Sequence, residues 1–127
     1  MNQRTTLIMA AIFGATAVIL GASGAHGLKD QLAANNATHI FELANRYHFF
    51  HVFALLATGI LINNFDAKRL GYAALFFVLG ITCFSGSLYA MSFVKWKVLG
   101  PITPLGGLFL IIGWALMGWS FMRKDVK

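Results

Sequence analysis

Apolar residues fill four long runs of the chain, and short polar segments separate these runs. The runs cover about residues 7–25, 43–62, 70–90 and 104–121. A helix needs about 20 apolar residues to cross a hydrocarbon core about 30 Å thick, and each run is close to that length. The pattern therefore predicts an all-α fold, a membrane-spanning four-helix bundle that forms a single domain over residues 1–127.

Capping signals stand at the start of the second and fourth runs. Asn35 or Asn36 can cap a helix that continues to Ile62, and Thr103 followed by Pro104 suits the start of the last helix. The second helix then holds about 27 residues and measures about 40 Å, more than the thickness of the hydrocarbon. Its first turns should project beyond the membrane core, and the polar stretch before it is predicted to be a short linker.

The first run also resembles a secretory signal, because Arg4 precedes it and the small residues "ASGA" (22–25) resemble a cleavage site. The small residues continue, however, into "HGLKD" (26–30). We therefore interpret the first run as a retained membrane span.

Composition supports residence in the lipid bilayer. Apolar residues make up 58% of the chain and charged residues only 11%, whereas soluble domains are about a quarter charged. The net charge is +6, but Lys and Arg never form a block of more than two. Proteins that bind nucleic acid cluster their basic residues along one groove or helix, so a nucleic-acid partner is not expected.

The distribution of basic residues predicts an orientation. With four spans, both termini lie on the same side of the membrane as the turn at 63–68. Six basic residues on that side face four on the other, which predicts cytoplasmic termini by the positive-inside rule. The six are Arg4, Lys68, Arg69, Arg123, Lys124 and Lys127, and the four are Lys29, Arg46, Lys95 and Lys97.

Two histidines stand where the second apolar run begins, in "ANRYHFFHVFALL" (44–56). Counted back from Ile62, His51 and His48 lie about 16 and 21 Å across the hydrocarbon, in its outer half. Asn45, His48 and His51 form a stripe, since each step of three residues turns the side chain by about 60°. Polar groups in lipid normally face the bundle interior or a wet cavity, and we expect the same here.

Other polar residues end or begin the remaining helices at the same membrane face. They occur in "GASGAHGL" (21–28), "SGSLY" (85–89) and "GPITPLGG" (100–107). Together with the stripe they make one chemically unusual end of the bundle. The candidate ligand-binding residues are His26, Asn45, His48, His51, Ser85, Tyr89 and Thr103.

Three interpretations of this end stay open. The histidines can serve a purely structural role by bonding backbone carbonyls or Tyr89. They can line a site for binding or permeation of a small or lipid-like molecule. They can also serve a membrane enzyme as acid–base groups or with a metal, although two histidines at this spacing need a third ligand such as His26 or Glu42. The sequence assigns no catalytic residue, no metal site and no cofactor.

Small residues recur along one face of the first run. This face has little bulk, so another backbone can approach it closely. The partner is a neighbouring helix of the same chain or a second subunit, and a homo-oligomer is therefore a possible assembly. The face consists of Ala10, Gly14, Ala17, Gly21 and Ala25.

Four ordered motifs together resemble a known family. They are "GASGAHGL" (21–28), "ANRYHFFHVFALL" (44–56), "GSLY" (86–89) and "TPLGGLFLIIGW" (103–114). The set is similar to the bacterial membrane family called domain of unknown function 423, whose animal relatives are called transmembrane protein 256. The resemblance covers most of the chain and implies a small multi-pass protein of the bacterial inner membrane. It implies no established activity, substrate or catalytic residue.

Overall fold

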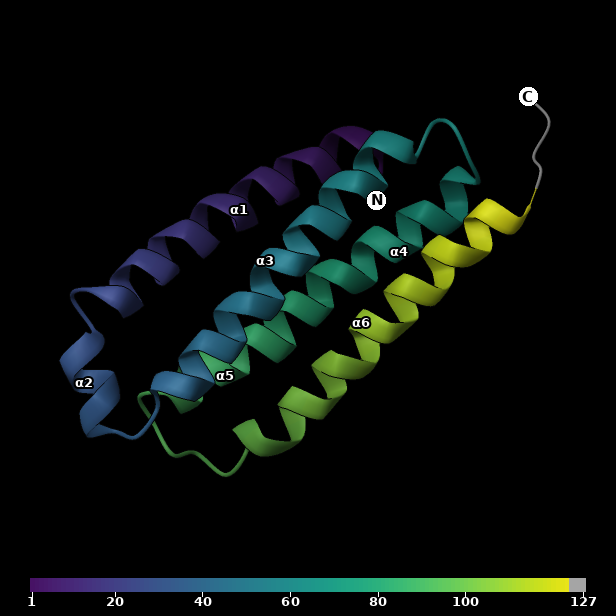
Figure 1. Ribbon diagram of the computed structural model, residues 1–127. Helices are drawn as coiled ribbons and strands as arrows, with labels where there is room; N and C mark the ends of the chain where they lie inside the picture. Colours follow the sequence, from purple (N-terminus) through teal and green to yellow (C-terminus); the bar gives the residue numbers. More distant parts are fainter. Residues whose placement is uncertain (124–127) are drawn as a thin grey trace.

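Four long helical columns run side by side (Figure 1) in a computed structural model that describes residues 1–123. Every regular element in that part of the chain is a helix, so the predicted all-α fold is confirmed. The short helix α2 links the first two columns at one end (Figure 1). The elements are α1 (Gln3–Ala25), α2 (Lys29–Ala34), α3 (Thr38–Leu61), α4 (Ala67–Gly80), the π-helix η1 (Ile81–Ser85), α5 (Gly86–Met91) and α6 (Leu99–Met122).

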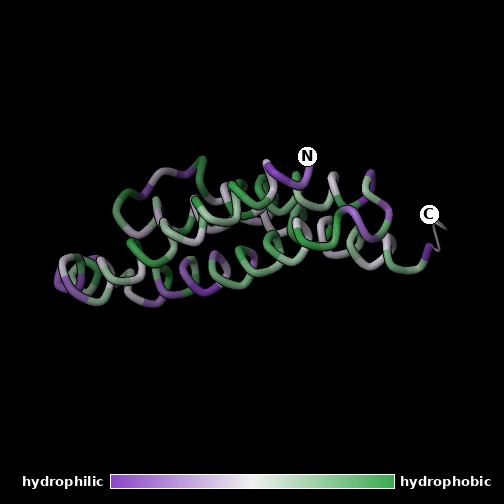
Figure 2. Tube along the Cα trace, turned by 90° about the horizontal axis from the view of Figure 1, so that it is seen from above, coloured by the Kyte–Doolittle hydropathy of each residue, from purple (hydrophilic) through white to green (hydrophobic). Residues whose placement is uncertain are grey.

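Three of these columns are long and apolar enough to cross a membrane, namely α1, the continuous α4–η1–α5 column and α6. The first turns of α3 carry His39, Glu42 and Arg46, which lower its hydropathy. Hydrophilic positions gather at both ends of the bundle and also occur in several turns of one helix nearer the middle (Figure 2). The crossing of the membrane by α3 stays a prediction. Lys124 and Lys127, which entered the charge comparison above, lie outside the described residues.

The α3 helix holds the two halves of the bundle together. It packs along α1 on one side and contacts α4, η1 and α5 on the other, while α6 packs along α4 and η1. The shared core between these columns is mainly apolar, and the buried hydroxyl of Thr58 within it donates to the Ala54 carbonyl. It is centred on Leu55, Leu70, Phe77, Leu110 and Met117.

The small-residue face of α1 lies against α3. Ala10 and Ala17 are buried, and a Cβ atom added at Gly14 would lie 3.4 Å from Cγ1 of Val52. At Gly21 the added atom would lie 2.9 Å from Oδ1 of Asn45. This face therefore serves packing within the chain, while self-association of the protein stays a prediction.

The predicted cap at Asn35 or Asn36 is wrong, because both residues end α2 rather than begin α3. Asn36 has a positive φ of 52°, and its N–H donates to the Ala33 carbonyl while the N–H of Ala37 donates to the Leu32 carbonyl. These two bonds form the Schellman arrangement that closes a helix C-terminus. Asn35 instead donates through Nδ2 to the Ser92 carbonyl at 3.2 Å, which ties this turn to the end of α5. The stretch predicted as a linker thus contains a helix with a defined end.

The predicted start of the last helix is also wrong. The α6 helix begins at Leu99, and Pro104 lies inside it. Pro101 fits the first turn, where a backbone N–H has no partner within the helix. Pro104 removes one bond of the interior, but the helix continues. Thr103 is therefore a residue of the second helical turn and not a cap.

We expect Asn36→Gly to retain the stability of the protein and Asn36→Val to lower it by about 1–2 kcal/mol. A left-handed backbone costs this much for residues other than glycine, and a β-branched residue has no local hydrogen bond to offset it. Thermal unfolding in detergent, followed by circular dichroism, measures the difference. Equal stability of the two variants would contradict the left-handed conformation.

Candidate functional site

Asn45, His48 and Tyr89 form a hydrogen-bonded cluster between α3 and α5. Nδ2 of Asn45 donates to the Ala17 carbonyl at 2.9 Å and to the Tyr89 hydroxyl at 3.0 Å. The same hydroxyl lies 3.0 Å from Nδ1 of His48. The cluster therefore joins α1, α3 and α5 through one tyrosine oxygen and one amide.

The donors in this cluster set the tautomer of His48. The Tyr89 oxygen accepts a hydrogen bond from Asn45. The Tyr89 hydroxyl in turn donates its proton in a hydrogen bond to Nδ1 of His48, which is the acceptor. Nε2 of His48 then carries the proton and points toward Oγ1 of Thr16 at 3.4 Å. The Thr16 hydroxyl in turn donates to the Phe13 carbonyl at 2.9 Å. A single directed chain of bonds thus runs from Asn45 to the backbone of α1.

His51 faces a different neighbour, helix α6. Its Nδ1 lies 2.8 Å from the Tyr47 carbonyl, and its Nε2 accepts from Nε1 of Trp114 at 3.0 Å. A carbonyl can only accept and an indole N–H can only donate. His51 is therefore a neutral imidazole with its proton on Nδ1, and both ring nitrogens are engaged.

The π-helical turn places Ser85 against α3. Oγ of Ser85 donates to the Ala44 carbonyl at 2.8 Å, and the side chain is buried. A π-turn widens the helix locally and often marks a functional site. Here η1 and the start of α5 form one wall of a cavity beside His48, as described below.

The remaining two candidates lie away from this cluster. His26 is exposed at the end of α1, where its backbone N–H closes the helix. Thr103 pairs its hydroxyl with that of Ser87 on α5. The seven candidate residues therefore do not form one group: His51 faces α6, Thr103 lies on α6 and faces α5, and His26 is exposed. Their roles in ligand binding stay predictions.

Two cavities flank the cluster. The first, which we call the His48 cavity, has a volume of about 170 Å³. It is bounded by α1, α3, η1 and α5, and its lining is Phe13, Thr16, Leu20, His48, Ile81, Thr82, Ser85, Gly86 and Tyr89. The second, which we call the Glu42 cavity, has a volume of about 240 Å³ and includes Asn45, Glu42 and Arg46. The Asn45–Tyr89 bond links the walls of the two cavities.

Sequence reasoning missed two partners of the histidines, Thr16 and Trp114. Thr16 lies beside the small-residue face of α1, and Trp114 is 63 residues from His51. No local spacing pairs residues so far apart. A stripe of polar residues on a helix indicates that partners exist, but packing decides which they are.

The polar groups of the site are satisfied within the chain. Across residues 1–123, every buried side-chain nitrogen or oxygen has a hydrogen-bond partner. In the same part of the chain no three side chains of His, Cys, Asp or Glu gather closely enough to hold a metal ion. Both histidines thus bond groups on neighbouring helices, as the structural interpretation expects, and their role stays a prediction.

Comparison with known proteins places the chain in a family. Residues 20–107 match the family model described as protein of unknown function (DUF423). A UPF0382 membrane protein of Staphylococcus epidermidis is 39% identical over 115 residues, which cover 91% of this chain and 93% of the relative. The UPF0382 inner membrane protein YgdD of Escherichia coli is 35% identical over 127 residues, which cover 100% of this chain and 96% of that protein. No solved structure gives a significant match.

These relatives agree with the resemblance seen in the sequence motifs. Their names describe membrane proteins, one of them of the inner membrane, and the described chain has three helices able to cross a bilayer. The inner-membrane location is therefore confirmed, while the orientation of the termini stays a prediction. The family match covers well over half of the chain, and so the protein belongs to the DUF423 family of membrane proteins.

Proposed function

We propose that the protein binds a small amphiphilic molecule in the His48 cavity. The polar group of the molecule contacts Nε2 of His48, and its apolar part lies among Phe13, Leu20 and Ile81. The supporting observation is the composition of the cavity, in which His48 and Tyr89 lie beside the apolar side chains of the wall. The three other polar side chains of the lining, those of Thr16, Thr82 and Ser85, donate their hydroxyl protons to backbone carbonyls. Ligand sites commonly combine apolar walls with a few convergent polar groups.

The weakest bond in the cluster is the one that a ligand can replace. Nε2 of His48 lies 3.4 Å from Thr16, whereas bonds of this type are strongest near about 2.9 Å. A hydroxyl or carbonyl oxygen of a ligand can accept the His48 proton at a better distance. Thr16 keeps its own bond to the Phe13 carbonyl at 2.9 Å, so the exchange leaves no group of the protein unsatisfied.

Access from the bilayer supports a lipid-like ligand. Thr82 and Gly86 line the cavity and are exposed on the surface of the bundle. In a membrane-embedded helix bundle that surface meets acyl chains rather than water. An apolar chain with one oxygen-containing head is therefore the chemistry that the cavity accepts.

The topology that goes with this proposal has all four columns crossing the bilayer, with both termini in the cytoplasm. Support comes from the packing of α3 along α1 and the α4–η1–α5 column, which places it at the same depth as two apolar helices. We expect Asn2→Cys to react with a membrane-impermeant maleimide in inside-out vesicles and to stay unlabelled in intact cells. Labelling in intact cells alone would reverse the orientation.

A structural role of the histidines is the second candidate, and complete hydrogen bonding of the buried side chains of residues 1–123 favours it. The two candidate functions predict different binding of molecules with a polar head. A purely structural cluster stabilises the bundle but gives no preference for a molecule with a polar head.

Photolabelling of the full chain in lipid nanodiscs tests the proposal. The probe is a long-chain alcohol with a diazirine on its alkyl chain, and an alkane of equal length with the same diazirine serves as the reference. We expect the alcohol to label the part of α1 between residues 13 and 20, and η1, in a saturable manner. The alkane should label the lipid-facing helices without saturation. Equal labelling by both probes would reject the proposal in favour of the structural role.

Variants sharpen this experiment. We expect Tyr89→Phe to reduce the saturable labelling severalfold, because the Tyr89 hydroxyl donates to Nδ1 of His48 and so keeps the proton on Nε2, where the ligand oxygen binds. Tyr47→Phe is the matched control: it removes a phenol hydroxyl from the same helix as His48, at a residue outside the lining of the His48 cavity. Saturable labelling that survives Tyr89→Phe at full strength, or that falls equally in Tyr47→Phe, would contradict the assigned position.

A further inference from the structure

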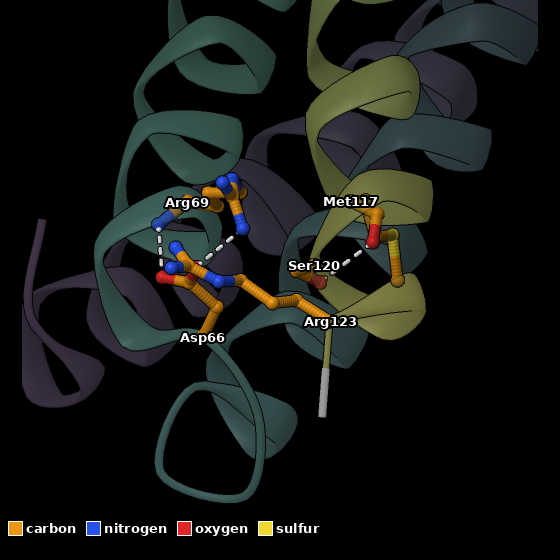
Figure 3. A network of polar contacts seen from close by, with 5 residues as sticks. All are labelled: Asp66, Arg69, Met117, Ser120 and Arg123. Atoms are coloured by element: carbon orange, nitrogen blue, oxygen red, sulfur yellow. Dashed lines mark hydrogen bonds and ion pairs between the residues drawn. The ribbon is translucent and has the colours of Figure 1, made fainter. Parts of the chain in front are cut away.

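A charged cluster lies at the end of the bundle where α4 begins and α6 ends (Figure 3). Asp66 caps α4: its Oδ1 accepts from the Arg69 N–H at 3.1 Å, and its Oδ2 accepts from Nη1 of Arg69 at 2.7 Å. Nη1 of Arg123, which follows α6, lies 4.0 Å from the same Oδ2. One carboxylate is thus shared by two guanidinium groups from different helices.

Arg69 is held in a defined position. Its guanidinium carbon lies 4.2 Å from the centre of the Trp119 ring, in addition to the bond with Asp66. Stacking on an aromatic face and pairing with a carboxylate fix the plane of the guanidinium. Its five N–H donors therefore point in directions that folding sets in advance.

The cluster lines an open cavity with an excess of positive charge. The cavity has a volume of about 340 Å³, and its lining is Asp66, Lys68, Arg69, Tyr72 and Arg123. Three cationic side chains and one anionic side chain leave a net charge of +2. This is the charge pattern of a site for an anion with several oxygen atoms, because Arg and Lys both donate to phosphate.

Exposed aromatic and apolar side chains surround this cavity. Tyr72 and Trp119 are 50% and 55% exposed, and such residues concentrate at the level of lipid headgroups. Phe65 packs edge-to-face on Phe121, with ring centres 4.9 Å apart, and both rings are also exposed. The cavity therefore has apolar surface beside it that a free inorganic anion does not use.

We propose that this cavity binds the phosphate group of an anionic phospholipid. Arg69, Lys68 and Arg123 contact the phosphate, and the exposed aromatic rings contact the glycerol and the first carbons of the acyl chains. Basic pockets between membrane helices bind anionic headgroups in this way. The site lies at the opposite end of the bundle from the Asn45–His48–Tyr89 cluster and does not depend on the function proposed above.

Native mass spectrometry of the detergent-purified full chain tests this site. Phosphatidylglycerol and phosphatidylcholine with identical acyl chains are the probes. We expect wild-type protein to retain phosphatidylglycerol in preference to phosphatidylcholine. We expect the double variant Lys68→Gln/Arg123→Gln to bind phosphatidylglycerol about 30-fold more weakly, from about 1 kcal/mol per basic residue near an anionic lipid.

A matched control separates the site from general electrostatics. Lys29→Gln/Lys97→Gln removes the same charge from exposed positions outside the cavity and should bind phosphatidylglycerol within about threefold of wild type. Equal losses in the two double variants, or equal retention of both lipids by wild type, would overturn the proposal. Arg69→Lys provides a second variant: it keeps the charge but loses the planar guanidinium that bonds Oδ2 of Asp66 and stacks on Trp119, and we expect intermediate binding.

The source of the phosphate is tested in the same assay. Inorganic phosphate at millimolar concentration is added to the protein loaded with phosphatidylglycerol. We expect the lipid to remain bound, since its apolar part also contacts the protein. Release of the lipid by inorganic phosphate would assign the cavity to a free anion and overturn the assignment to a phospholipid.

Discussion

Gly106→Ala is expected to destabilise the protein by about 3 kcal/mol, the upper end of the cost of overpacking a core. A Cβ atom at this position of α6 would lie 2.7 Å from Cα of Phe84 and 2.8 Å from the carbonyl carbon of Cys83. Both are backbone atoms of η1 and cannot turn away as a side chain can. The helices must separate, and the packing that close approach provides between membrane helices is lost.

The neighbouring glycine supplies the control for this prediction. A Cβ atom at Gly107 would meet a ring carbon of Phe84 at 3.7 Å, which is ordinary contact. Gly107→Ala should therefore be neutral or raise stability, since alanine is the better helix former by about 1 kcal/mol. Loss of helicity during titration with a denaturing detergent measures both variants. Equal stability of Gly106→Ala and Gly107→Ala would show that α6 and η1 do not approach as closely as described.

His51→Ala is expected to cost about 1–3 kcal/mol. The variant leaves the indole N–H of Trp114 without its acceptor at 3.0 Å, and an unsatisfied donor costs about this much. The lower part of the range applies in lipid if the indole finds another partner. The free energy of unfolding of the variant and of the wild type, measured in detergent, gives this cost.

A double-mutant cycle identifies the bond behind this cost. Trp114→Phe removes the N–H donor and keeps an aromatic ring in its place. The double variant should then cost less than the sum of the two single variants, because both remove the same interaction. Strict additivity would mean that His51 and Trp114 do not interact, and it would remove the link that we describe between α3 and α6.

The hydropathy of the chain predicts the number and order of the long helices but not their ends. The run at 43–62 corresponds to a helix that begins at Thr38 and ends at Leu61. Apolar residues mark the part of a helix that is buried or in lipid, whereas hydrogen bonding continues through polar turns beyond it. The helix α2 has six residues, too few for a periodic pattern to reveal it.

Two boundary predictions were wrong because asparagine and proline each occur at more than one position in helices. Asparagine caps helix N-termini, but it also tolerates the left-handed backbone that ends a helix, and Asn36 adopts the latter. Proline suits the first turn of a helix but is also accommodated in membrane helices. Pro104 falls in the second category because α6 had already begun at Leu99.

The candidate site was predictable in one respect. A stripe formed by Asn45, His48 and His51 was expected to face the bundle, and the structure places all three side chains against other helices. The stripe turns by about 120° over its six residues. Asn45 and His48 therefore meet α1 and α5, whereas His51 meets α6. The partners on those helices follow from packing over long sequence separations, which one sequence does not encode in any local pattern.

The imidazole nitrogen spectrum of the full chain, labelled with ¹⁵N at its four histidines, tests the central claim most directly. The measurement is made in nanodiscs, before and after addition of a long-chain alcohol and of the alkane of equal length. We predict that the alcohol shifts the protonated nitrogen of His48 and that the alkane does not. His51 should keep its proton on Nδ1 in both samples, and the exposed His26 and His39 serve as internal controls. A His48 nitrogen resonance that does not shift at saturating alcohol would contradict the binding of an amphiphile beside His48, and so would equal shifts of all four histidines.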